Sequence, residues 1–68
     1  MVQVPLPEAG AGHVVLFRMR AGAIAKHCGM LTGNGTMVHA RERLGVIEEP
    51  YTETWQRRAV AAFQFPQE

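Results

Sequence analysis

The segment Thr32-Gly33-Asn34-Gly35 constrains the fold of this chain more than any other stretch of the sequence. Glycine and asparagine tolerate the positive backbone angles of tight turns, and short apolar runs flank the segment over residues 25–31 and 36–40. This arrangement predicts a β-hairpin. Each predicted strand carries one histidine, His27 and His39, and two histidines on neighbouring strands can form a base and its orienting partner.

The length of the hairpin loop decides whether the two histidines share a face of the sheet, because strand side chains alternate between faces. A two-residue loop, Asn34-Gly35, would pair Met30 with His39 and put the histidines on opposite faces. A three-residue loop, Gly33-Asn34-Gly35, would pair Gly29 with His39 and put both on one face. The sequence permits either loop.

The rest of the chain predicts three further strands and one short helical turn. The near-continuous apolar run over 13–19 indicates a strand buried on both faces. Over 59–65 alanine favours a helix, but the alternation that ends in Phe63 and Phe65 favours a strand, which we choose. The remaining elements are a strand over 44–48 that Pro50 ends, and a helical turn over 51–57 with Thr52 as N-cap and Trp55 facing inward.

The predicted fold is mainly β, a small antiparallel five-stranded meander with one short helical turn. Residues 1–12, with two prolines and two glycines, form an extended lead-in, and residues 13–66 form the domain. A chain of 68 residues is marginally stable alone, and its single cysteine excludes an internal disulfide. The histidines and the cysteine lack the spacing of a zinc site, so no metal or cofactor is expected and a protein partner is the expected support.

Charge and hydropathy exclude several classes of partner. The net charge of +1 provides no electrostatic surface for nucleic acid. No apolar run has the ~20 residues of a membrane span. The N-terminus lacks the basic and apolar regions of a secretory signal, so synthesis in the cytoplasm is expected.

A site built on the two histidines needs a nucleophile, and the sequence offers none. Cys28 follows His27 directly, so its side chain points to the opposite face of the strand, and a small buried hydrophobe is its expected role. Serine is absent, and Thr32 and Thr36 belong to the turn. The alternative interpretation is that His27 and His39 are ordinary half-buried histidines with hydrogen-bond partners.

Several segments resemble the C-terminal half of NlpC-type cell-wall cysteine peptidases, in particular the branch carried by tailed phages and gene transfer agents. The resemblance covers residues 10–66. Its most specific parts are a His-x-Gly strand and a later His-Ala, with a Gly-Asn-Gly turn between them. The segments concerned are Gly12–Arg20, Lys26–Leu31, Gly33–Ala40, Trp55–Arg58 and Phe63–Pro66.

The resemblance implies a papain-like sheet and cleavage of the peptide stems of peptidoglycan, beside a γ-linked glutamate. By the family pattern His27 matches the general base and His39 the residue that orients it. The family's nucleophile lies earlier, in an Asp-Cys-x-Gly-like motif that the 26 residues before His27 do not contain. His13 also departs from the pattern, which has an aspartate after that glycine. The likeness is therefore to half a domain, without the helices that cover the sheet.

Two functions are consistent with this resemblance. The first is a structural component of a phage or phage-like tail tip, made in the host cytoplasm, that packs against other tail-tip or hub proteins and is not catalytic alone. The second is the C-terminal half of a peptidoglycan endopeptidase whose cysteine another chain supplies. A third interpretation is a small β-domain whose likeness to the family is accidental. Bacterial peptidoglycan is a further expected partner.

Overall fold

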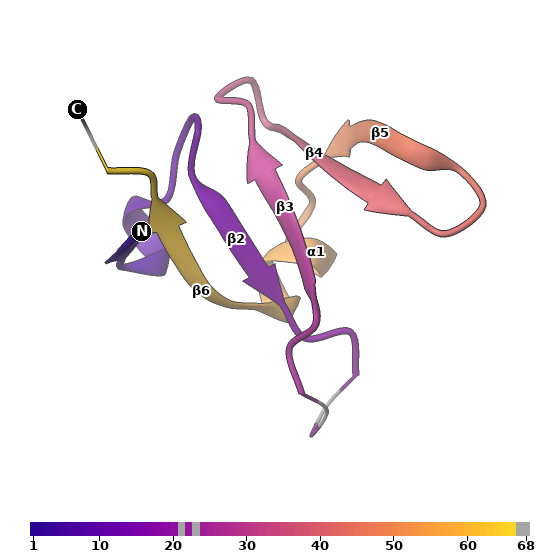
Figure 1. Ribbon diagram of the computed structural model, residues 1–68, viewed down its shortest axis with the longest axis horizontal. Coiled ribbons are helices and arrows are strands. Elements are labelled where there is room, and N and C mark those ends of the chain that lie inside the picture. Colours follow the sequence, from indigo (N-terminus) through magenta and orange to yellow (C-terminus); the bar gives the residue numbers. More distant parts are fainter. Residues whose placement is uncertain (21, 23, 67–68) are drawn as a thin grey trace.

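The computed structural model describes residues 1–20, 22 and 24–66 and places their strands in a single six-stranded antiparallel sheet (Figure 1). The strand order is β1-β6-β2-β3-β4-β5, so the last strand lies between the first two. The elements are β1 (Val2–Val4), the 3-10 helix η1 (Leu6–Glu8), β2 (Val14–Phe17), β3 (His27–Leu31), β4 (Thr36–Arg41), β5 (Gly45–Pro50), α1 (Glu53–Arg58) and β6 (Ala59–Gln64).

The mainly β class is confirmed, but the sheet has six strands in the described part of the chain and not the five expected. The additional strand, β1, lies within the expected lead-in and pairs with β6, with Val4 opposite Ala62. The alternation Val2-Gln3-Val4 suits an edge strand, and the free edge of β6 offers its backbone groups as partners. Only β2 to β5 follow one another as a meander.

The central hairpin of β3 and β4 has the three-residue loop. Gly29 pairs with His39 and Leu31 with Met37, and the backbone N–H of Thr32 donates to the carbonyl of Thr36. Gly33 and Gly35 have positive φ angles of 90° and 77°, which glycine adopts without steric cost. The sequence allowed both loops, and the structure has the one that puts the two histidines on the same face.

The chain after β5 forms the expected helical turn and final strand. Thr52 is the N-cap residue of α1, although its side chain makes no capping hydrogen bond, and Trp55 is buried as expected. The choice of a strand over a helix for the last segment is confirmed by the pairing of β6 with β2. This pairing contains a bulge, because Leu16 lies opposite Ala61 and Phe17 opposite Ala59, which leaves Val60 as an extra residue.

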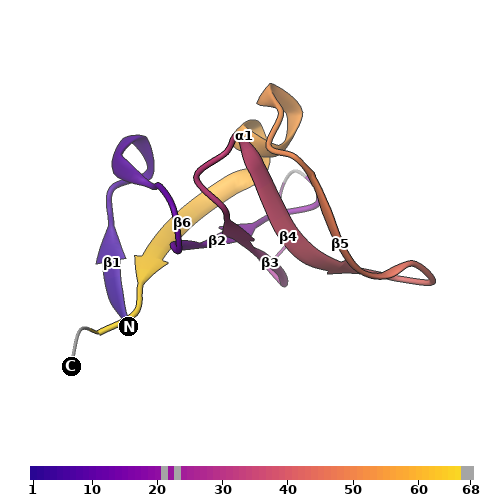
Figure 2. The same cartoon turned by 90° about the horizontal axis from the view of Figure 1, so that it is seen from above.

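The core lies on one face of the sheet, which α1 covers (Figure 2). The expectation that residues 13–19 are buried on both faces is wrong, because Val15 and Phe17 are fully buried whereas Val14 and Leu16 are only half-buried. The core residues are Val15, Phe17, Leu31, Met37, Trp55 and Ala62. None of the helices in the described ranges has the length and apolar character needed to cross a bilayer.

Candidate functional site

His27 and His39 lie on the core face of the sheet and form a direct hydrogen bond. His39 is opposite Gly29, and His27 lies two residues before Gly29 on the same face of β3. His27 Nε2 is 2.7 Å from His39 Nδ1, and the two rings are nearly perpendicular, with an interplanar angle of 86°. His39 is buried and His27 is half-buried, so the pair connects the interior to the surface.

Gly29 provides the space that this pair needs. A Cβ atom at this position would lie 3.3 Å from the Cβ of His39 and 3.4 Å from the ring of Phe17. The first distance is shorter than ordinary van der Waals contact and the second is at its lower limit, so any larger residue would displace one of these side chains. The His-x-Gly pattern of β3 therefore has a steric basis.

Glu49 is the third member of the cluster, and it was not among the site residues expected from the sequence. It lies on β5, two residues after Ile47, which pairs with His39, so its side chain shares the face of the histidines. Its Oε2 atom is 2.6 Å from His39 Nε2, and its Oε1 atom accepts a hydrogen bond of 3.0 Å from Trp55 Nε1. The expected strand ended at residue 48, whereas β5 continues to Pro50. The sequence signal that could have identified Glu49 is its spacing of two residues from Ile47, which puts both side chains on the same face of a strand that continues to residue 49.

The carboxylate of Glu49 is held in its charged form. The hydrogen bond with His39 is the main cause that lowers the pKa of Glu49, and the Trp55 N–H and the charge of Arg41 act in the same direction. Arg41 Nη1 lies 3.5 Å from Oε2 of this carboxylate. The acidic end of the cluster is therefore an anion at neutral pH.

The pKa of His27 is lowered, mainly because burial disfavours the imidazolium form. The charges of His39 and Arg41 lower it further, and Glu49 opposes them. His27 is accordingly a neutral imidazole at neutral pH. A neutral imidazole has a lone pair that accepts a proton, which is the property that a general base needs.

Trp55 supports both histidines from α1. Its ring stacks on that of His27 at a centroid distance of 5.9 Å and meets the ring of His39 edge-on at 5.0 Å. Phe17 packs against the same indole at 5.1 Å, and the guanidinium of Arg58 lies 5.4 Å from its ring centroid. One aromatic side chain therefore fixes the two histidines, the carboxylate and the core relative to one another.

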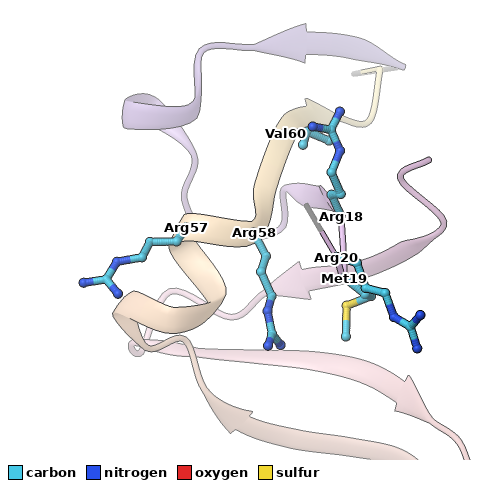
Figure 3. A pocket seen from close by; sticks show the side chains of 6 residues that line it. All are labelled: Arg18, Met19, Arg20, Arg57, Arg58 and Val60. Carbon is cyan, nitrogen blue, oxygen red and sulfur yellow. The ribbon is translucent and has the colours of Figure 1, made fainter. Parts of the chain in front are cut away.

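Two shallow cavities adjoin this cluster and share Met19. The first, of about 300 Å³, is lined by Met19, His27, His39, Ala40, Arg41, Glu42 and Trp55. The second, of about 360 Å³, is lined by Arg18, Met19, Arg20, Arg57, Arg58 and Val60, the bulged residue of β6 (Figure 3). Figure 3 shows that the guanidinium groups fan out and that Arg57 extends away from the other side chains. Arg57 pairs with Glu53 at 2.8 Å.

Neither Cys28 nor a hydroxyl group completes a nucleophilic site. Cys28 lies on the face of β3 opposite to His27 and is exposed, so the expectation of a buried small hydrophobe is wrong. Its partner on β2, Leu16, is only half-buried, because the described elements pack on the other side of the sheet. The hydroxyls of Thr32 and Thr36 bond to each other at 2.6 Å beside the hairpin loop and are not hydrogen-bonded to either histidine.

His13, the third histidine, is separate from the cluster. It precedes β2, and its Nδ1 atom accepts a hydrogen bond of 2.9 Å from the backbone N–H of Gly10. Within the described ranges, no group of three or more histidine, cysteine or acidic side chains is arranged to bind a metal ion.

Comparison with known proteins identifies the family of the chain. The model of the NlpC/P60 family matches residues 1–64, which include the whole sheet and all members of the histidine cluster. No curated protein and no solved structure matches the chain. Because the family match covers nearly all of the sequence, the chain belongs to the NlpC/P60 family.

Proposed function

We propose that this chain supplies the histidine half of a cell-wall cysteine peptidase site, with His27 as general base and His39 as the residue that orients it. The observation that carries this proposal is the 2.7 Å hydrogen bond between the two imidazoles, with one ring buried and the other reaching the surface. A base held by a second side chain is the arrangement that activates a nucleophile in acyl transfer. The membership of the chain in a cell-wall peptidase family supports this chemistry.

By itself the chain is not catalytic in this proposal, because its one cysteine lies on the far face of β3. The nucleophile comes from outside these 68 residues. His27 then takes the proton of that thiol, and the thiolate attacks the carbonyl carbon of the scissile amide. The same imidazole returns the proton to the leaving amine, which is expelled as the acyl-enzyme forms, and water later releases the acyl group.

We place the protein in the tail of a phage or phage-like particle, bound to tail-tip or hub proteins after synthesis in the host cytoplasm. The segments that resemble the phage-borne branch of the family support this location. A partner is also supported by large apolar side chains that remain exposed, among them Met30, Leu44 and Val46.

The second candidate function is a structural tail component with no catalytic role. The exposed Cys28 on the wrong face and the absence of serine favour it. The two functions differ in one measurable property, which is whether a thiol from elsewhere reaches His27.

The experiment that separates them is a structure of the protein within its natural particle, together with hydrolysis assays on peptidoglycan. The enzymatic proposal expects a cysteine sulfur within about 4 Å of the His27 ring, and hydrolysis that a thiol-alkylating reagent abolishes. A His27 surface covered by partner side chains with no thiol would support the structural role. Hydrolysis by the purified chain alone would contradict both functions.

The arginine-lined pocket next to the histidines suits an acidic peptide. A γ-linked glutamate leaves its α-carboxylate free, and Arg18, Arg20 and Arg58 form no ion pair within the described residues. Replacing Arg20 with glutamine is expected to weaken binding of a γ-glutamyl peptide about two- to five-fold, the size of one exposed ion pair. Titration of the chain with the peptide, followed by NMR, measures this change.

Arg57→Gln is the matched control, because it removes the same charge from the same pocket. Its guanidinium pairs with Glu53 and extends away from the other side chains (Figure 3), so binding is expected to stay unchanged. Amidation of the peptide carboxylate is expected to abolish the difference between the two variants. Equal weakening by both substitutions would assign the effect to overall charge and contradict a subsite at Arg20.

A further inference from the structure

We propose that Glu49 is a positioning residue that fixes the tautomers of both histidines, so that Nδ1 of His27 carries the free lone pair. This inference rests on the proposed function for its catalytic meaning, but the tautomers themselves are a property of the chain. The resemblance to known peptidases assigns roles to His27 and His39, and neither it nor the family match assigns one to Glu49.

The hydrogen bond between the histidines does not determine its own direction. In one arrangement His27 Nε2 donates to His39 Nδ1, and the free nitrogen of His27, Nδ1, is an unprotonated base. In the reverse arrangement His39 Nδ1 donates, so the proton of a neutral His27 is on Nδ1 and that nitrogen is no base. Both arrangements satisfy the 2.7 Å contact equally, so a third group must select one of them.

Glu49 makes this selection because a carboxylate only accepts hydrogen bonds. Its Oε2 lies 2.6 Å from His39 Nε2, so this nitrogen must carry the proton. The Nδ1 atom of a neutral His39 is then an acceptor, and His27 Nε2 must donate to it. Two successive hydrogen bonds thus link Glu49 to His27 and leave Nδ1 as the unprotonated nitrogen of His27.

Further contacts fix the orientation of the Glu49 carboxylate. Its other oxygen, Oε1, accepts the indole N–H of Trp55, and Arg41 lies 3.5 Å from Oε2. His39 is buried, so an Nε2–H without its acceptor would be an unsatisfied buried donor. The described residues leave no buried side-chain nitrogen or oxygen without a hydrogen-bond partner.

Glu49→Gln tests the proposal sharply, because an amide has one acceptor and one donor end. The Trp55 N–H requires an acceptor, so the carbonyl oxygen of the introduced amide is expected to face Trp55 and its NH₂ to face His39. His39 Nε2 must then accept, which reverses both tautomers and puts the proton of His27 on Nδ1. The substitution is nearly isosteric and is expected to preserve the fold.

The measurement is ¹⁵N NMR of the histidine rings in the full chain over a pH series that extends to alkaline pH, because protonated and unprotonated ring nitrogens have separate resonances. The wild-type chain is expected to show Nε2–H on both His27 and His39, and the Glu49→Gln chain is expected to show Nδ1–H on both. Glu48→Gln is the matched control, because Glu48 is exposed and contacts the hydroxyl of Thr36 on the hairpin. In the Glu48→Gln chain the tautomers of His27 and His39 are expected to be those of the wild type.

A proton on Nδ1 of His27 in the wild-type chain would overturn the proposal, without the need for any variant. Unchanged tautomers in a folded Glu49→Gln chain would overturn it as well. Once a cysteine-bearing partner restores hydrolysis, the same substitution is expected to lower kcat by about 10²–10⁴-fold with little change in KM. The absence of any hydrolysis would refute the proposed function but leave the NMR result intact, so the two failures are distinguishable.

Discussion

Replacing Trp55 with alanine is expected to lower the free energy of unfolding by about 3–5 kcal/mol. Trp55 is 7% exposed, packs against Phe17 and both clustered histidines, and donates its N–H to Glu49. Its removal leaves a large cavity in the core beneath α1, and it leaves one carboxylate oxygen of Glu49 without its donor. Urea unfolding of the two proteins, followed by circular dichroism, measures the difference.

The expected loss is comparable with the total stability of so small a domain. At roughly 0.05–0.15 kcal/mol per residue, a chain of 68 residues has about 3–10 kcal/mol of stability, so the alanine variant is expected to be partly unfolded at about 25 °C. Val46→Ala is the control, because Val46 is 74% exposed and its truncation is expected to change stability by less than about 0.5 kcal/mol. A Trp55→Ala loss below about 1 kcal/mol would show that the tryptophan is not part of the core.

The hairpin and the final strand were predictable because local sequence determines them. Gly33 and Gly35 adopt positive φ angles that favour glycine, and the alternation of Phe63 and Phe65 identified β6 despite its alanines. The loop length was not predictable, since a two-residue and a three-residue loop differ by one backbone pairing. That single pairing decides whether the histidines meet at all.

The features that the sequence did not reveal depend on contacts between distant residues. β1 forms only because β6 returns to pair with it, about sixty residues later in the chain. Glu49 joins the site because β5 continues two residues further than expected and pairs with β4. The exposure of Cys28 likewise depends on which face α1 covers, and periodicity within one strand does not specify that choice.

Replacing His27 with glutamine is expected to reduce hydrolysis by about 10²–10⁴-fold once a cysteine-bearing segment is present. The side-chain amide of glutamine is able to donate to His39 Nδ1, as Nε2–H of the imidazole does, but it accepts no proton at neutral pH. The variant therefore removes the base and retains the hydrogen bond that holds His39. Single-turnover hydrolysis of peptidoglycan fragments measures the chemical step separately from product release.

His13→Gln is the matched control for this experiment. It replaces another histidine with the same amide at the other end of β2, where His13 contacts Gly10 and not the cluster. Its rate is expected to equal that of the wild type.

If both variants retain full activity with a thiol in place, His27 is not the base, and the pair it forms with His39 serves only the stability of the hairpin. If only His27→Gln is inactive and its NMR spectrum is that of a folded protein, the loss of hydrolysis is due to the missing proton acceptor. The fold and the hydrogen bond to His39 are then retained. The half-buried His27, and not the buried His39, would then be the residue that contacts the nucleophilic thiol.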